Sequence, residues 1–342
     1  MQSGDSWVVV GLDNGGNKNN ATVLDASGKF LVDELLESPS RVTEGPDVAV
    51  AALVDTFEDI LRRTGLSRDR VRGVGLDTPG PASADGVISS KGSTNFAHPG
   101  WRSYDFRGAL EKKLGLPVVY NNDGNAAALY AHYELFGPLA HQRGSISAII
   151  GTGFGGGVIE KGEVVKGAAG MAGELGHVHI PTHGLLEPDQ PVPHCNCGFD
   201  GDAESFASLT GIEKNLLPYW LTRYPGHELN RAESVAKAAK LVRAYGEAGD
   251  EMALKIFAQQ AKAIGRLFTI AANFTDPDGY FLGGGVVEAA PAFRDWYLAK
   301  VRENTALREE QVRASRFEMV PHLDMAGARG AAIAALERIH TR

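Results

Sequence analysis

The first third of the chain alternates short apolar runs with stretches of helical periodicity. Residues 8–12 are mainly apolar, glycines interrupt the run at 15–16, and residues 21–24 resume an extended pattern, which predicts a strand, a tight turn and a returning strand. Apolar positions at helical spacing then predict an amphipathic helix over 47–64, before a buried strand over 71–76. A helix over 106–114, a strand over 117–120 and a helix over 125–136 follow. This alternation favours a mainly parallel α/β core.

The second half begins with another strand and glycine turn at 146–157, so the chain is expected to contain two related halves. The pattern then predicts helices over 232–246 and 250–274, a strand over 280–282 and a last helix over 325–339. Because Pro138 and polar residues interrupt the pattern, we expect an N-terminal α/β domain over 1–137 and a C-terminal α/β domain over 138–342. The last helix is available to pack back on the first domain.

A loop with four prolines, residues 181–194, is long enough to indicate a functional role.

Composition narrows the choice of partners. The chain of 342 residues has a formal net charge of -8, and its charges are dispersed without a basic stripe, so we expect no nucleic-acid partner. The chain shows no leader pattern at its start and no apolar run that could cross a bilayer, so we expect a cytoplasmic protein without a membrane partner. Its two cysteines, Cys195 and Cys197, are spaced for a metal site or a free thiol pair rather than a structural disulfide.

Three glycine-rich turns follow predicted strands. Such turns can present backbone N–H groups to phosphate, because glycine permits a close approach and positive φ. Asp13, at the end of the first strand, is placed to hold Mg²⁺ through water. The alternative is that the turns are only tight hairpins, and none of them has the spacing of a P-loop or a dinucleotide fingerprint. The turns are Gly15-Gly16, Gly151-Thr152-Gly153 and Gly283-Gly284-Gly285.

The order of motifs resembles the ROK family of bacterial sugar kinases and repressors, over residues 8 to 335. The motifs are Asp13-Asn14-Gly15-Gly16, Thr78-Pro79-Gly80-Pro81, Asn95 with Pro99-Gly100-Trp101, Asn122-Asp123-Gly124-Asn125-Ala126-Ala127, Gly151-Thr152-Gly153, Gly173-Glu174-Leu175-Gly176-His177, Cys195-Asn196-Cys197-Gly198 and Gly283-Gly284-Gly285. The resemblance implies an α/β fold of the two-domain actin-like ATPase type, a duplicated ribonuclease-H-like architecture with an interdomain cleft.

The resemblance also implies a catalytic aspartate and a set of sugar ligands. Asp123 matches the family's catalytic base, and the alternative for it is a helix N-cap. At a helix start, with an ordinary Asp pKa near ~3.9, it is expected to be a weak base that mainly orients the acceptor hydroxyl. Besides Asp123, the residues that match the family's sugar contacts are Asn95, Asn122, Glu174, His177 and Glu204, the last of which has the alternative of a solvated helix residue.

The family's zinc site is altered in this chain. It is usually built from a histidine and three cysteines, and here the third cysteine position is Asp202. The resemblance therefore implies His177, Cys195 and Cys197 as ligands, with Asp202 as a fourth because carboxylate is an acceptable zinc donor. His194 is another candidate, and a lost zinc site is the alternative.

The resemblance implies an ATP-dependent kinase that phosphorylates a sugar hydroxyl, with glucose as the leading acceptor. Another hexose, a hexosamine or a cyclitol, or a non-catalytic sugar sensor, are the alternatives. Family repressors carry a DNA-binding segment before the first strand, which begins near Trp7 here, so we expect an enzyme. A homodimer or homotetramer would suit the family.

ATP, with its Mg²⁺, is expected to meet the glycine turns and the residues after the first of them. Asn17 replaces the threonine usual in that turn, which leaves another phosphate donor conceivable. The residues expected to hold ATP are Asp13, Gly15, Gly16, Asn17, Lys18, Gly151, Thr152 and Gly153 for the phosphates and metal, and Gly283, Gly284 and Gly285 for adenosine.

Overall fold

The computed structural model describes residues 7–91 and 95–340. The chain divides into two compact units by its internal contacts, one comprising Met1–Glu134, Glu163–Gly173 and His322–Arg342, the other Leu135–Gly162 and Glu174–Pro321. The domain limits expected from the sequence stay a prediction. Residues 1–6, on which the expectation of no leader depends, lie outside the described residues.

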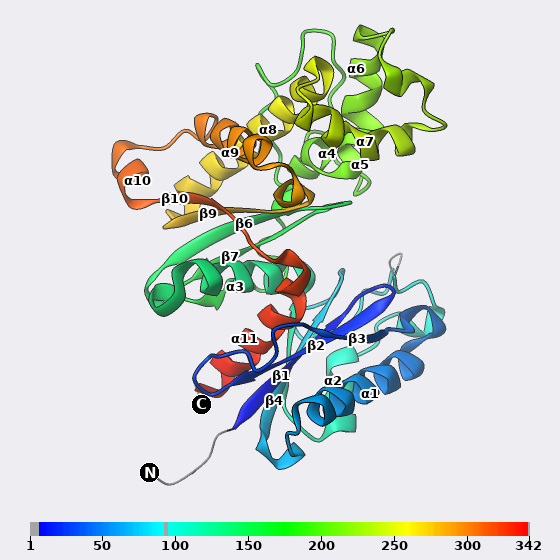
Figure 1. Ribbon diagram of the computed structural model, residues 1–342, viewed down its shortest axis with the longest axis vertical. Helices are drawn as coiled ribbons and strands as arrows, with labels where there is room; N and C mark the ends of the chain where they lie inside the picture. The colour runs from blue at the N-terminus through cyan, green and yellow to red at the C-terminus, as the bar shows by residue number, and fades with distance from the viewer. Residues whose placement is uncertain (1–6, 92–94, 341–342) are drawn as a thin grey trace. The chain divides into compact units, whose positions relative to one another are not determined.

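The first unit is built on a five-stranded sheet in the order β3-β2-β1-β4-β5 (Figure 1). Strands β1 and β2 are antiparallel, whereas β4 is parallel to β1 and β5 is parallel to β4. Its elements are β1 (Val8–Asn14), β2 (Lys18–Asp25), β3 (Leu36–Pro39), α1 (Pro46–Thr64), β4 (Val71–Thr78), α2 (Phe106–Leu114), β5 (Val118–Asn122), nearly all of α3 (Asp123–Phe136) and α11 (Ala326–His340).

Helices cover both faces of this sheet. Alternate residues of a strand point to opposite faces, and Val10 and Leu12 pack in one apolar core with Leu53 and Phe57 of α1. Gly11, between them, faces α11: a Cβ there would lie 2.0 Å from the carbonyl oxygen of Ala328. Only glycine allows α11 to approach the sheet this closely, so the last helix is fixed against the strands that carry the site described below.

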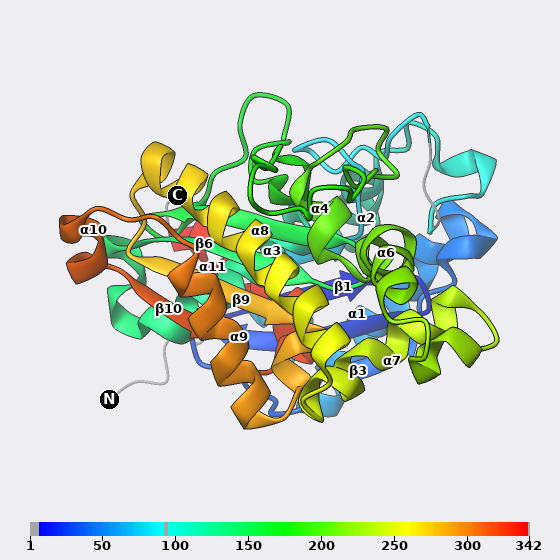
Figure 2. The ribbon, with the colours of Figure 1, turned by 90° about the horizontal axis from the view of Figure 1, so that it is seen from above.

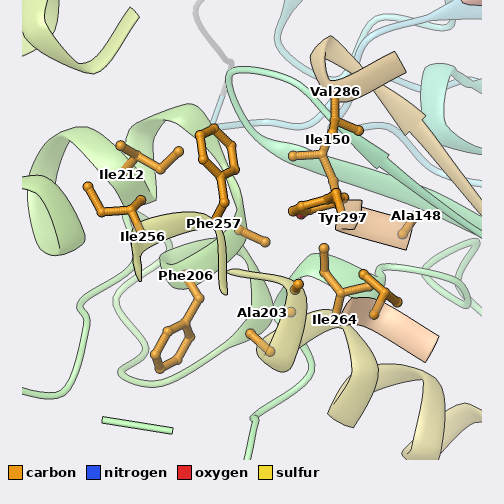
Figure 3. Packing of buried hydrophobic residues seen from close by; sticks show 14 of the residues in the cluster. Ala148, Ile150, Ala203, Phe206, Ile212, Ile256, Phe257, Ile264, Val286 and Tyr297 are labelled. Carbon is orange, nitrogen blue, oxygen red and sulfur yellow. The ribbon is translucent and has the colours of Figure 1, made fainter. Parts of the chain in front are cut away.

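The second unit contains the strands β10, β9, β6 and β7, hydrogen-bonded in that order, and α8 and α9 lie over one face of this sheet (Figures 1 and 2). Large apolar side chains such as Phe206, Phe257 and Tyr297 belong to one buried apolar cluster of this unit (Figure 3). The elements are β6 (Gly144–Ile150), β7 (Phe154–Glu160), α4 (Ala203–Ala207), α5 (Leu209–Gly211), α6 (Leu217–Arg223), α7 (Val235–Glu247), α8 (Glu251–Thr275), β9 (Gly279–Gly284), α9 (Pro291–Glu303), α10 (Glu309–Ala314) and β10 (Arg316–Met319). The short strand β8 (Glu163–Val164) belongs to the segment Glu163–Gly173 of the first unit.

The expectation of a mainly parallel core was wrong. Each sheet is mixed: β1 with β2 and β6 with β7 are antiparallel, while β1 with β4 and β6 with β9 are parallel. The reason lies in the short glycine turns, because a tight turn can join only antiparallel neighbours whereas parallel strands need a longer crossover. The four-proline loop is irregular over 181–193, as its composition predicts.

Candidate active site

Two carboxylates occupy matching positions on neighbouring strands of the first sheet. Asp13 near the end of β1 and Asp77 near the end of β4 are partners in the parallel register. A Cβ on Gly327, the second residue of α11, would lie 2.6 Å from Asp77 Oδ2 and 3.0 Å from Asp13 Oδ2. Both oxygens therefore converge on the start of α11, and glycine is required there because a side chain would displace them.

Asp123 joins these two, and we call Asp13, Asp77 and Asp123 the carboxylate cluster. Burial raises the pKa of Asp13 to about 6, against the opposing hydrogen bond that Asn20 Nδ2 donates to Oδ2 at 2.8 Å and with a contribution from the charge of Asp123. Asp77 is 1% exposed, and burial raises its pKa well above the ordinary value, with the charges of Asp13 and Asp123 adding to the shift. The three carboxyl groups are thus close enough to influence one another's ionisation.

Asp123 is the first residue of α3 and directly follows β5. The N-cap role proposed as its alternative falls to Asn122, whose Oδ1 accepts the Asn125 N–H at 2.8 Å. The expectation of an ordinary, weakly basic carboxylate was wrong in direction. Desolvation by the surrounding protein raises the pKa of Asp123 and outweighs the hydrogen bond from the Gly124 N–H. The residue stays exposed in part, so the carboxyl is accessible to a substrate and is a better base than expected.

The first glycine turn links β1 to β2. Gly15 N–H donates to the Lys18 carbonyl at 2.9 Å and closes the turn. A Cβ on Gly16 would lie 2.6 Å from Asn95 Oδ1, so the expected phosphate turn and the expected sugar ligand Asn95 are neighbours in this unit.

The two residues after the glycines point to solvent. Asn17 and Lys18 are both exposed. The Asn17 carbonyl accepts the Ser40 N–H at 3.1 Å, which anchors its backbone, and Lys18 forms an ion pair with Glu37. Lys18 would have to leave Glu37 to reach a phosphate. Exposed pairs of this kind are worth at most ~1 kcal/mol, so the exchange costs little.

The second glycine turn, in the other unit, follows β6 and is exposed. Its backbone is tied to the start of α5, because Leu209 N–H donates to the Gly151 carbonyl at 3.0 Å and Thr210 Oγ1 donates to the Thr152 carbonyl at 2.8 Å. The turn is therefore held in a defined shape by the hydrogen bonds that its carbonyl groups accept.

The third glycine turn lies beside the second. β6 and β9 are parallel, and Ile150, the residue before the second turn, pairs with Gly284. Gly284 has φ of 101°, and a Cβ there would lie 1.8 Å from the Ile150 carbonyl oxygen, so only glycine fits. Arg243 donates to the Gly285 carbonyl. Gly283 is in register with Ile149, so the strand pairing places the third glycine turn at the same end of the sheet as the second turn.

Glu204 is not the solvated helix residue that its alternative assumed. Its Oε2 accepts the Phe154 N–H at 2.8 Å, and Cys195 Sγ donates to its Oε1 at 3.5 Å. The side chain therefore bridges the strand after the second glycine turn and the cysteine segment. Glu174 immediately precedes the 3₁₀ helix Leu175–His177 and is exposed.

Four potential metal ligands converge in the same unit, and we call them the thiolate cluster. One donor atom from each of them lies within 4.8 Å of the others, and the residues are His177, Cys195, Cys197 and Asp202. Tetrahedral zinc with bonds of ~2.0–2.3 Å needs ligands roughly 3.3–3.8 Å apart, so the cluster fits zinc with a modest contraction. Both cysteines are free thiols, in agreement with their spacing.

Asp202 is held for this role by two sets of contacts. Its Oδ1 caps α4 by accepting the Ser205 N–H at 2.9 Å, and its Oδ2 lies 3.2 Å from His177 Nδ1 and 3.3 Å from Cys197 Sγ. Although burial opposes the shift, hydrogen bonds from Cys195, Ser205 and His177 lower the pKa of Asp202, which keeps it anionic. His194, the other candidate ligand, is exposed and pairs with Asp200 at 2.7 Å, so it is not part of the cluster.

Sequence reasoning missed Asp77. The available signal was an acidic residue that ends an apolar strand, as Asp13 does, on the strand next to it in the parallel part of the sheet. Without knowledge that β1 and β4 are neighbours, that equivalence is not visible.

The chain is similar to known proteins over most of its length. The sequence matches the ROK family over residues 9–338. A glucokinase from Halalkalibacterium halodurans is 31% identical over 288 residues, which are 83% of this chain and 82% of the relative. An N-acetyl-D-glucosamine kinase from Vibrio parahaemolyticus is 27% identical, with 95% of this chain and 98% of the relative covered.

The structural comparison agrees. A ROK hexokinase from Thermus thermophilus superposes with a TM-score of 0.76 and 29% identity, covering 98% of this chain and all (100%) of the other. The fold is the two-domain actin-like ATPase architecture, and the chain belongs to the ROK family. Within residues 7–91 and 95–340, no helix combines the length and the apolar character needed to span a membrane.

Proposed function

We propose that this protein transfers the terminal phosphoryl group of ATP to a hydroxyl of a hexose, with glucose as the leading acceptor. Relatives named glucokinase, aligned over most of the chain, support the acceptor class. Relatives named N-acetyl-D-glucosamine kinase and N-acetylmannosamine kinase favour a hexosamine as the second candidate.

The position of Asp123 is the observation that carries the proposal. The carboxyl stands between a strand end and a helix start, remains partly exposed, and is not required for capping, which Asn122 performs. Its raised pKa suits a group that accepts the proton of the attacking hydroxyl. Phosphoryl transfer is governed mainly by positioning and charge neutralisation, so a fixed carboxylate that aims the hydroxyl provides the main requirement.

The other polar groups would hold the reactants. Asn95, beside Gly16, and Asn122 would bind sugar hydroxyls in the first unit, and Glu174, His177 and Glu204 would do so in the second. Each group is left unsatisfied when a substrate lacks its hydroxyl, which is how such a site discriminates among sugars. The glycine turns would cradle the phosphates and the adenosine end of ATP.

The acidic and thiolate groups fit metal ions. Asp13, with one oxygen held by Asn20, suits Mg²⁺, which prefers oxygen ligands and supplies neutralisation of phosphate charge when bound. The thiolate cluster fits zinc, which would fix His177 and, through Cys195, the orientation of Glu204. A cytoplasmic location and a homo-oligomer remain predictions.

An ADP-release assay over a panel of hexoses, N-acetylhexosamines and cyclitols tests the proposal. We expect turnover with at least one hexose and the highest kcat/KM for glucose. Binding of sugar by calorimetry without ADP release would instead support a non-catalytic sensor.

A matched pair of variants isolates the role of Asp123. Asp123→Asn keeps shape and should lower kcat at least about 10³-fold, while sugar affinity stays within a few-fold. Asp123→Glu keeps basicity but moves the carboxyl and should also be severely impaired. Asp105→Asn, in a true N-cap that accepts the Gly108 N–H at 2.8 Å, should stay active because Asn caps as well as Asp. Normal turnover by Asp123→Asn would defeat the proposal.

A further inference from the structure

Asp77 has no part in the proposed phosphoryl transfer, although it lies in the carboxylate cluster. It is 1% exposed, and its Oδ1 has no hydrogen-bond partner among the described residues. Leaving an unpaired carboxylate in a protein interior costs several kcal/mol. In its ionised form Asp77 therefore needs a partner that the folded chain itself does not supply.

Within the ranges the structure describes, no lysine, arginine or histidine forms an ion pair with Asp13, Asp77 or Asp123. The hydrogen bonds are equally few: Asn20 serves Asp13, and the Gly124 N–H serves Asp123. An acidic group kept only for structure would be expected to bond to the backbone or to a basic side chain, as Asp105 does at its helix.

The oxygens of Asp13 and Asp77 converge from adjacent strands. The parallel register places their backbones side by side. Oδ2 of each carboxylate lies within 3.0 Å of the position that a Cβ on Gly327 would occupy. Oxygen donors gathered from two carboxylates, without a competing cationic side chain, are the ligand type that Mg²⁺ and Mn²⁺ prefer, with water completing the coordination.

We propose that Asp77 joins Asp13 in binding a divalent, oxygen-preferring cation, so that the protein holds this cation before a nucleotide arrives. The inference rests on the proposed function for its use, since the cation would stand beside Asp123. A cation also gives the buried carboxyl of Asp77 the partner that the chain does not provide. Gly327 is part of the arrangement because it leaves room for both carboxylates.

Titration of Mn²⁺ into the nucleotide-free full chain tests the inference, with free Mn²⁺ measured by electron paramagnetic resonance. The protein is first loaded with Zn²⁺ so that the thiolate cluster is filled. We expect Asp77→Asn to weaken Mn²⁺ binding at least tenfold relative to the wild type, and Asp13→Asn to do the same. Asp105→Asn, a similar acid-to-amide change in the same unit, should bind as the wild type does.

Thermal unfolding provides a second measurement. Asp77→Asn replaces a buried acidic group by a neutral amide of the same shape, so the metal-free variant should be at least as stable as the wild type, and Mn²⁺ should raise its Tm less. Unchanged Mn²⁺ affinity in Asp77→Asn, or no Mn²⁺ binding by the wild type without nucleotide, would overturn the inference. A metal-free Asp77→Asn chain that fails to fold would also do so, because Asp77 would then be structural. The Mn²⁺ titration measures binding and does not depend on catalysis. A chain that binds Mn²⁺ but transfers no phosphoryl group in the ADP-release assay would therefore refute only the proposed function.

Discussion

Replacement of Gly327 by alanine perturbs the carboxylate cluster without touching any carboxylate. The added Cβ would lie 2.6 Å from Asp77 Oδ2 and 2.9 Å from Asp13 Cγ. Ordinary carbon contacts are near ~3.5–4.0 Å, so both groups must retreat by on the order of 1 Å. The carboxyl groups can move because they are the ends of side chains, whereas the backbone of α11 is fixed against the sheet.

The expected changes in stability and activity have different sizes. Alanine in a helix is favoured over glycine by about 0.5–1 kcal/mol, which offsets much of the cost of moving two carboxyl groups. The free energy of unfolding should therefore change by less than about 1 kcal/mol. A misplacement of ~1 Å at a catalytic centre can cost about 10²-fold in rate, so kcat should fall by roughly that factor.

The assay combines ADP release at saturating sugar and ATP with urea unfolding of the same preparations. Gly226→Ala is the control, because a Cβ there meets no atom within 4 Å and kcat should be unchanged. A Gly327→Ala enzyme with wild-type kcat and KM for the metal ion would refute the reasoning. It would show that the positions of Asp13 and Asp77 do not matter for activity. A loss of several kcal/mol in stability would also contradict it, because the clash would then have displaced the helix.

Two further predictions concern the remaining acidic groups. Asp202→Asn should keep the cap on α4 but lower the amount of bound zinc, measured by mass spectrometry. Asp202→Ala should in addition lose about 1 kcal/mol of stability, which the hydrogen bond from the Ser205 N–H supplies. Equal zinc content in both variants and the wild type would argue against Asp202 as a ligand. The folded-state pKa of Asp13 is raised to about 6, so the native state binds more protons than the unfolded state between about pH 4 and pH 6, and the stability of the metal-free protein should fall as pH rises through this window. Asp13→Asn should flatten that part of the curve by on the order of 2 kcal/mol in denaturant titrations, and an unchanged slope would contradict the prediction.

The candidate site was predictable from sequence where function requires particular residue types at short spacing. The glycine turns, the Asn122-Asp123 pair and the Cys195-Asn196-Cys197 segment are each contiguous, so their order alone carries the family resemblance. Helices with strong periodicity were also predicted closely: α1 spans Pro46–Thr64 against the expected 47–64, and α8 spans Glu251–Thr275 against the expected 250–274.

Elements without a strong local pattern were not predicted. β3 and β10, each of four residues, form because neighbouring strands offer hydrogen bonds to them, and no expectation was made for them or for α9 and α10. The mixture of parallel and antiparallel strands in each sheet was not predicted either. Hydrophobic patterns indicate that a segment is a strand but do not show which strand lies next to it.

The sequence by itself therefore determined the family, the turns that suit phosphate and the residue types available for sugar and metal. Local chemistry carries that information, since a glycine that permits positive φ or a cysteine pair at ligand spacing has the same meaning in any context. The tertiary structure alone decided which acidic groups act on one another. Asp77 stands beside Asp13 only because β4 pairs with β1, and its pKa rises because burial removes it from water and because the charges of Asp13 and Asp123 lie nearby. Solvent exclusion and through-space repulsion depend on distance in the folded chain, which residue spacing does not encode.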